Sequence, residues 1–264
     1  MVNGSAGGQP NIWWYVSVLY NSKNDEYVAF GGAYGHLTDR YQSYTSQSPT
    51  GPFQLRRTLS AVFGGPGDTT FFKDDDDKAY IAYNAADGVI PGAVASRFTY
   101  VYQLNAEYDD IVSSTLCNTS VSMEGLWLMK NKGIYYLLGS GLVNYDVDDD
   151  FYLTAPTPLG PWTNRGLFAP VGSRTFHSQT FKGLTVQGST GVTHVFIGHR
   201  WCNPPVISAT CDNARVGNVS TWCCWPPFTD AISIWLPLSI AANGSLIPLQ
   251  WHDHWLLDTN GGSM

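Results

Sequence analysis

The sequence predicts an all-β protein, more closely a five-bladed β-propeller whose N-terminal blade is incomplete or missing. Three observations indicate this class. Apolar hairpins recur at a regular spacing, no convincing amphipathic helix is present, and 27 glycines and 15 prolines suit many short strands joined by tight turns. The 264 residues suffice for one large domain. We expect a Gly-rich leader at residues 1–11, the propeller at residues 12–258 and a tail at residues 259–264.

Four hairpins carry the repeat. Their equivalent apolar positions are 53, 55 and 60 residues apart, namely Tyr27, Tyr80, Tyr135 and Val195. Another apolar strand precedes each hairpin, at residues 17–20, 69–72, 125–129 and 180–184. Units of about 55 residues with several strands each fit four-stranded propeller blades, whereas a β-sandwich would show shorter and less regular spacing. A weaker fifth unit begins at Leu236.

Charge and composition restrict the partners. The net charge is −7 with scattered Lys and Arg, which argues against nucleic acid, and no apolar run approaches the roughly 18 residues that cross a membrane. The acidic run at residues 73–78 (KDDDDK) falls at the turn of the second hairpin, where we expect it to be solvated. The many aromatic residues favour a neutral ligand such as a sugar, whose rings stack on exposed aromatic faces. We expect no metal or other cofactor, and a monomer.

Cysteines and glycosylation sequons bear on location. The five cysteines leave at least one unpaired within the chain and show no zinc-type spacing. Four Asn-x-Ser/Thr sequons are present, beginning at Asn3, Asn118, Asn218 and Asn243. Together they predict a secreted glycoprotein, although Met1 begins no recognisable signal peptide.

The repeat also aligns four candidate site residues. In a propeller the first strand of each blade lines a central channel, so polar residues at the start of these strands converge on one pocket. The residues just before those strands are 54, 56 and 55 residues apart: Trp14, three residues ahead of its strand, and Asp68, Glu124 and Gln179, each directly ahead. Asp68 and Glu124 are of the type that acid–base chemistry at a glycosidic bond requires. Taken singly, each could be a turn or surface carboxylate, but their common phase favours a site.

Several segments resemble a known family. They are SPTGPF (48–53), GDTTFFKDDDDKAYIAY (67–83), MEGLWLMKNKGIYYLLGSG (123–141), TPLGPW (157–162), HSQTF (177–181) and WLPL (235–238). In this order they are similar to the exo-β-1,3-galactanase branch of glycoside hydrolase family 43. The resemblance implies a five-bladed propeller that releases galactose, with inversion, from β-1,3-galactan, the backbone of arabinogalactan. It also makes the unit at Leu236 the outer part of the last blade.

The resemblance assigns catalytic roles. Glu124 matches the general acid, and Asp68 matches the carboxylate that orients this acid and raises its pKa. Gln179 matches a glutamine that stands where other members of the family have the basic Asp. An amide can position a water through its carbonyl oxygen but does not readily accept its proton.

Other residues are candidates for contact with the sugar. Trp14 could stack on it, His177 lies two residues before Gln179, and Asn144 and Tyr145 follow the third hairpin. The chain departs from the family at Gly67, where the galactanases have Arg, and at Trp14, where they have a substrate-binding Glu.

Two alternatives follow from these departures. One is a catalytically impaired, carbohydrate-binding propeller derived from such an enzyme. The other is a different family 43 activity, an arabinofuranosidase or xylosidase, which would require a basic Asp in a first blade.

Overall fold

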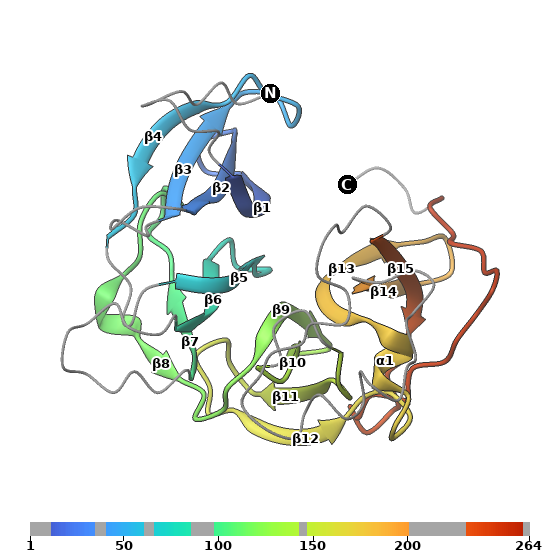
Figure 1. Ribbon diagram of the computed structural model, residues 1–264. Helices are drawn as coiled ribbons and strands as arrows, with labels where there is room; N and C mark the ends of the chain where they lie inside the picture. Colours follow the sequence, from blue (N-terminus) through green and yellow to red (C-terminus); the bar gives the residue numbers. More distant parts are fainter. Residues whose placement is uncertain are drawn as a thin grey trace. The chain divides into compact units, whose positions relative to one another are not determined.

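A computed structural model of the chain describes residues 12–34, 41–60, 66–85, 98–142, 147–200 and 231–260 (Figure 1). Their regular structure is almost entirely β, apart from a short 3-10 helix, η1 (Ser113–Thr115), and a four-residue turn, α1 (Arg174–His177). The strands form four antiparallel sheets.

The first sheet holds β1 (Ile12–Asn21), β2 (Glu26–Tyr34), β3 (Tyr41–Ser46) and β4 (Gln54–Thr58). The second holds β5 (Pro66–Lys73), β6 (Ala79–Ala85), β7 (Thr99–Gln103) and β8 (Cys117–Asn118). The third holds β9 (Glu124–Asn131), β10 (Ile134–Ser140), β11 (Phe151–Ala155) and β12 (Thr163–Leu167). The fourth holds β13 (Gln179–Gln187), β14 (Val192–Arg200) and β15 (Ile232–Leu238).

In every sheet, strands that follow one another in the chain lie side by side, which is the order of a propeller blade. The described residues therefore form an all-β propeller with four blades, and the predicted class is confirmed. A fifth blade is not among these residues, and Leu236 lies in β15 of the fourth sheet. The predicted leader at residues 1–11 lies outside the described residues.

The chain divides into two compact units. The first comprises residues 1–135 and 155–163, and the second comprises residues 136–154 and 164–264. In the first unit, one hydrophobic core joins the sheets β1–β4 and β5–β8, with the rings of Phe30 and Phe71 stacked 4.0 Å apart. In the second unit, Phe168 packs against Phe196 at 5.5 Å, and Tyr136 donates a hydrogen bond to the Gly244 carbonyl at 2.8 Å.

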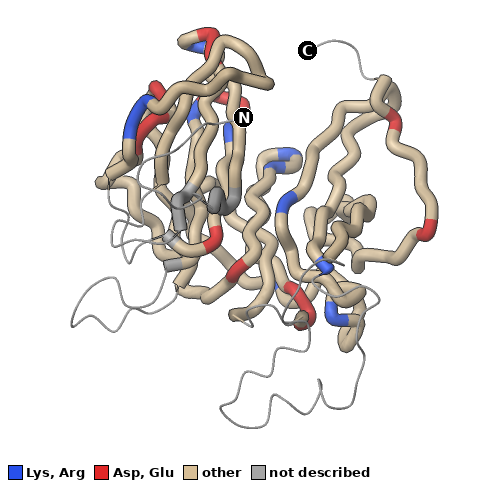
Figure 2. The backbone as a smooth tube through the Cα atoms, turned by 45° about the horizontal axis from the view of Figure 1, so that its top comes forward, with Lys and Arg blue, Asp and Glu red and all other residues tan. Residues whose placement is uncertain are grey.

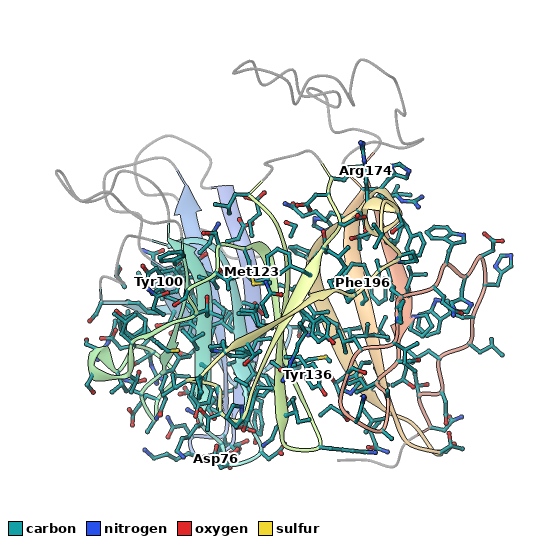
Figure 3. The ribbon with its side chains drawn as sticks, turned by 90° about the horizontal axis from the view of Figure 1, so that it is seen from below. Asp76, Tyr100, Met123, Tyr136, Arg174 and Phe196 are labelled. Atoms are coloured by element: carbon teal, nitrogen blue, oxygen red, sulfur yellow. The ribbon has the colours of Figure 1, made fainter. Side chains whose placement is uncertain are left out.

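The acidic turn between β5 and β6 differs from its prediction at one residue. Asp76 and Asp77 are exposed and pair with Lys78 and Lys73, as a solvated turn would, and Asp76 lies at one end of the strands (Figure 3). Asp74 is instead buried. Its carboxylate accepts hydrogen bonds from Lys130 and Tyr135, each at 2.5 Å, because a buried carboxylate needs a cation and donors to replace water.

Charged residues are few, and the two signs are interspersed along the described chain (Figure 2). Among the described residues, no helix is long and apolar enough to cross a membrane.

Candidate active site

Asp68 stands in a β-bulge near the start of β5. Pro66 pairs with Ala85 and Thr69 pairs with Tyr83, so Gly67 and Asp68 together face the single residue Asn84. A bulge changes the direction of side chains locally, and bulges are common next to active sites. A Cβ at position 67 would lie 2.0 Å from Oδ1 and 3.0 Å from the carbonyl oxygen of Asn84, so a larger residue there would require the Asn84 side chain to move. The predicted carboxylate thus projects from an irregular rather than a regular strand position.

The Tyr41 hydroxyl holds this bulge. From β3 it donates a hydrogen bond to the Gly67 carbonyl at 2.9 Å and accepts one from Oγ1 of Thr69 at 2.6 Å. Burial raises the pKa of Tyr41 well above its usual value, and the nearby charge of Asp68 adds to this rise. The hydroxyl therefore stays protonated and remains a donor. No sequence signal singled out Tyr41, because its role depends on a contact between different sheets.

Glu124 begins β9, the strand that lies beside β5 in the first unit. The next residue, Gly125, has a left-handed backbone with φ of +59°, which glycine adopts without steric cost. The Gly125 N–H donates a hydrogen bond to Oδ2 of Asp68 at 2.8 Å. Asp68 therefore fixes the backbone next to Glu124, and both predicted carboxylates belong to one local arrangement. Both residues are partly exposed, so reactants in solvent can reach them.

Gln179 begins β13 in the second unit and is buried. Its Nε2 donates a hydrogen bond to Oγ of Ser140, the last residue of β10, at 3.0 Å. This bond fixes the plane of the amide and leaves the carbonyl oxygen as its acceptor end. Ser140 was not a predicted site residue, and nothing in its local sequence distinguishes it.

His199 pairs with Gln179 across the β13–β14 ladder, so both side chains are on the same face of the sheet. Its ring stacks on Phe181 at 3.9 Å. Burial lowers the pKa of His199, and the positive charge of Lys182 lowers it further. Burial also lowers the pKa of Lys182 to about 8. Neutral imidazole is thus favoured beside Gln179, at a residue that the sequence analysis did not select.

A strained turn leads into Gln179. Arg174, Thr175, Phe176 and His177 have φ of +50°, +49°, +57° and +58°, so α1 is a left-handed turn made without glycine. Such a backbone costs L-residues roughly 1–2 kcal/mol each and persists only where the surroundings hold it. Figure 3 shows Arg174 at one end of the second unit, whereas Phe196 lies inside it. The predicted residue His177 closes this turn.

The remaining predicted residues are only partly described. The backbone of Trp14 lies in β1 and pairs with Gly32, whereas its side chain lies outside what the structure describes. Asn144 and Tyr145 lie outside the described residues. Within the described ranges, no group of three or more His, Cys, Asp or Glu residues could hold a metal ion.

The described residues thus form a four-bladed β-propeller in which Asp68 and Glu124 belong to one local arrangement. No protein-family model and no curated protein sequence matches the chain.

Comparison with solved structures, in contrast, finds similar proteins. One neighbour, described as an exo-β-1,3-galactanase from Bifidobacterium bifidum s17, is 25% identical over 98% of this chain and 78% of its own, with a TM-score of 0.73. A GH43 β-1,3-galactosidase bound to galactodeoxynojirimycin is 19% identical over 93% and 77%, with a TM-score of 0.73. An exo-β-1,3-galactanase from Clostridium thermocellum is 23% identical over 93% and 50%, with a TM-score of 0.72. The predicted resemblance to glycoside hydrolase family 43 is confirmed at the level of the fold.

Proposed function

We propose that this protein is an inverting, exo-acting glycoside hydrolase that releases galactose from β-1,3-galactan, as found in arabinogalactan. The hydrogen bond from the Gly125 N–H to Asp68 carries the proposal, because it ties Asp68 to the backbone directly after Glu124 on a fold similar to that of exo-β-1,3-galactanases. In this proposal Glu124 is the general acid at the glycosidic oxygen and Asp68 is the carboxylate that orients it, the roles that the resemblance implies.

In the proposed reaction, Glu124 gives its proton to the glycosidic oxygen while the bond from this oxygen to the anomeric carbon breaks. A water attacks the anomeric carbon from the opposite face, and its proton passes through solvent water, from which Glu124 is protonated again. Asp68 keeps Glu124 in place through the adjacent Gly125 N–H. Gln179 orients the water through its carbonyl oxygen, the role that the resemblance implies, and the hydrogen bond from its Nε2 to Ser140 fixes the plane of the amide.

The test is incubation of the purified chain with β-1,3-galactan oligosaccharides while proton NMR follows the product. The α-anomer of galactose should appear first, because attack from the opposite face inverts the β linkage. Glu124→Gln should lower kcat by about 10²–10⁴-fold, the usual contribution of a general acid. Glu107→Gln is the matched control, since Glu107 is exposed and pairs only with Lys23 among the contacts described for it.

A folded chain that binds galactan in calorimetry but releases no galactose would refute hydrolysis and favour the carbohydrate-binding alternative. Release of arabinose or xylose from arabinan or xylan oligosaccharides, with no galactose from galactan, would favour the arabinofuranosidase or xylosidase alternative.

We also propose that a fifth blade completes the propeller. Three alternate residues of β1, Val16, Val18 and Tyr20, are exposed on the face opposite to the core residue Leu19, and Leu55 of β4 is exposed on the same face. In the fourth sheet, Leu184 and Trp235 are exposed. Large apolar patches usually mark surfaces that another element covers. Such exposure supports an additional blade, placed by the sequence prediction at the N-terminal side.

Secretion and glycosylation are part of the same proposal. Asn118 and Asn243, which begin two of the sequons, are both exposed, as a glycan requires. Expression in a secreting eukaryotic host should yield a monomeric protein whose mass falls on treatment with a peptide N-glycosidase. An unchanged mass would contradict glycosylation.

A further inference from the structure

The left-handed turn α1 (Arg174–His177) is held at its entry by one carboxylate. Oδ2 of Asp149 accepts a hydrogen bond from the Gly172 N–H at 2.6 Å, and Oδ1 accepts one from the Arg174 N–H at 2.7 Å. Both oxygens therefore bind backbone donors on either side of Ser173. A charged acceptor makes stronger hydrogen bonds than a neutral one, which suits a segment whose backbone is strained.

A second anchor lies inside the turn. Thr175 is fully buried, and its Oγ1 accepts a hydrogen bond from the Asp150 N–H at 2.9 Å while it donates one to the Asp148 carbonyl at 3.3 Å. The Thr175 carbonyl in turn accepts a hydrogen bond from Oγ of Ser178 at 2.6 Å. One threonine hydroxyl thus ties the turn to the backbone on both sides of Asp149.

The two flanking aspartates bind the other neighbours of Gln179. Oδ2 of Asp150 accepts hydrogen bonds from the N–H of Thr180 at 2.8 Å and from its Oγ1 at 2.5 Å. Oδ2 of Asp148 accepts one from the Gly141 N–H at 3.0 Å. Gly141 directly follows Ser140, the acceptor for the Gln179 amide. The three consecutive aspartates therefore bind the turn before Gln179, the residue after it and the strand end that receives its side chain.

We propose that Asp149 and Thr175 are positioning residues, which hold the left-handed turn so that the Gln179 amide meets Ser140 and the reacting water at fixed places. Four strained residues would relax once a clamp is removed, and the start of β13 would move with them. The role of the water rests on the function proposed above, whereas the clamp itself does not.

Two pairs of variants test the clamp. Asp149→Ala removes both acceptors, and Asp76→Ala is its control, because Asp76 also makes a hydrogen bond in a turn but lies in the first unit. Thr175→Val keeps the shape of the side chain and removes Oγ1, whereas Thr175→Ser keeps the hydroxyl. Backbone amide exchange of residues 172–180, followed by mass spectrometry, should accelerate at least tenfold in Asp149→Ala and Thr175→Val. It should stay near the wild-type rate in Thr175→Ser and Asp76→Ala.

A rescue separates strain from general damage. Arg174→Gly in the Asp149→Ala background should restore much of the protection, because glycine adopts φ of +50° without steric cost. On galactan oligosaccharides, Asp149→Ala should lower kcat by about 10²-fold with KM little changed, the effect of displacing a positioned group by about 1 Å. Binding of galactose, measured by calorimetry, should be nearly unchanged.

Unchanged exchange of residues 172–180 in Asp149→Ala, or equal behaviour of Thr175→Val and Thr175→Ser, would overturn the inference. If Asp149→Ala does not fold, the comparison of amide exchange between Thr175→Val and Thr175→Ser decides whether the clamp exists. If the wild-type chain does not cleave galactan, the proposed function fails, and amide exchange still decides whether the clamp exists.

Discussion

The carboxylate of Asp68 accepts a hydrogen bond from the N–H of Gly125 at 2.8 Å. This hydrogen bond joins the bulge of β5 to the second residue of β9, which directly follows Glu124. A side chain 57 residues earlier in the sequence therefore determines where the proposed proton donor begins its strand. Asp68 therefore contributes in two ways that can be separated: its carboxylate accepts a hydrogen bond from the backbone, and it places a negative charge beside the candidate site.

Substitutions of Asp68 should separate these properties. Asp68→Asn keeps an acceptor oxygen for the Gly125 N–H, so the free energy of unfolding should change little while kcat falls for lack of the charge. Asp68→Ala should lower kcat further and cost about 1–3 kcal/mol of stability, since a charge-assisted hydrogen bond is lost. Urea unfolding and galactose release measure the two effects. Equal stability of Asn and Ala variants would show that the bond to Gly125 does not contribute.

Tyr41→Phe should loosen the bulge that carries Asp68. The substitution leaves the Gly67 carbonyl and the Thr69 hydroxyl without their common partner, at an expected cost of about 1–3 kcal/mol. We expect kcat to fall together with stability, because Asp68 directly follows Gly67 and its position depends on the bulge. Tyr20→Phe is the control, since the Tyr20 hydroxyl donates to Asp25 at an exposed position. A loss of activity in Tyr41→Phe no greater than in the control would contradict this role.

Gly67→Ala tests whether the bulge has space for a side chain. The new Cβ would lie 2.0 Å from Oδ1 and 3.0 Å from the carbonyl oxygen of Asn84, so we expect a loss of about 1–3 kcal/mol from overpacking. Asn84→Ala in the same chain should recover only part of it, because the backbone carbonyl remains. Gly133→Ala is the control, because a Cβ at Gly133 would have no atom within 4 Å. The loss of stability in this variant therefore measures only the strain of an alanine at φ of +80°. An additive double-mutant cycle between positions 67 and 84 would refute the contact.

Asp150 should make stability fall as pH rises. Burial raises its pKa well above the ordinary value of 3.8, and the charge of Asp148 raises it further, although hydrogen bonds from Thr180 oppose the rise. A carboxyl whose pKa is higher when folded stabilises the fold below the unfolded value, and this contribution is lost as pH rises through the folded value. Asp150→Asn mimics the protonated acid and should flatten urea midpoints between pH 4 and 8.

The control for this pH series is Asp76→Asn. The hydrogen bond from Lys78 lowers the pKa of Asp76, so its small contribution has the opposite sign, being lost as pH falls. Identical pH slopes for wild type and Asp150→Asn would show that Asp150 is ionised in the folded protein.

The exposed apolar residues of β1 give a prediction about the fifth blade. Val18→Ser should change the free energy of unfolding by no more than about 0.5 kcal/mol if water covers this face. If another blade covers it, the same change should cost about 1.5–3 kcal/mol, as for burial of a valine. Val28→Ser, in the core on the opposite face of the sheet, is the positive control. A near-neutral Val18→Ser would contradict the covering blade.

The sequence by itself determined the repeating part of the molecule. Hairpin spacing and alternating apolar residues are local properties, so they predicted the blades, and their phase aligned Asp68, Glu124 and Gln179 just before the strands. In the structure these strands begin slightly earlier, so the three residues lie within the first three positions of β5, β9 and β13. Turn residues such as Gly133, with its positive φ, belong to the same local information.

Only the tertiary structure decided what holds those residues in place. The Tyr41 hydroxyl at the bulge, the burial of Asp74 beside Lys130 and the left-handed backbone of Thr175 all depend on partners at least 25 residues away. The same local sequence would adopt a solvated turn or a right-handed backbone without these partners. Periodicity records which residues face a core, whereas a hydrogen bond between distant segments leaves no pattern in the sequence.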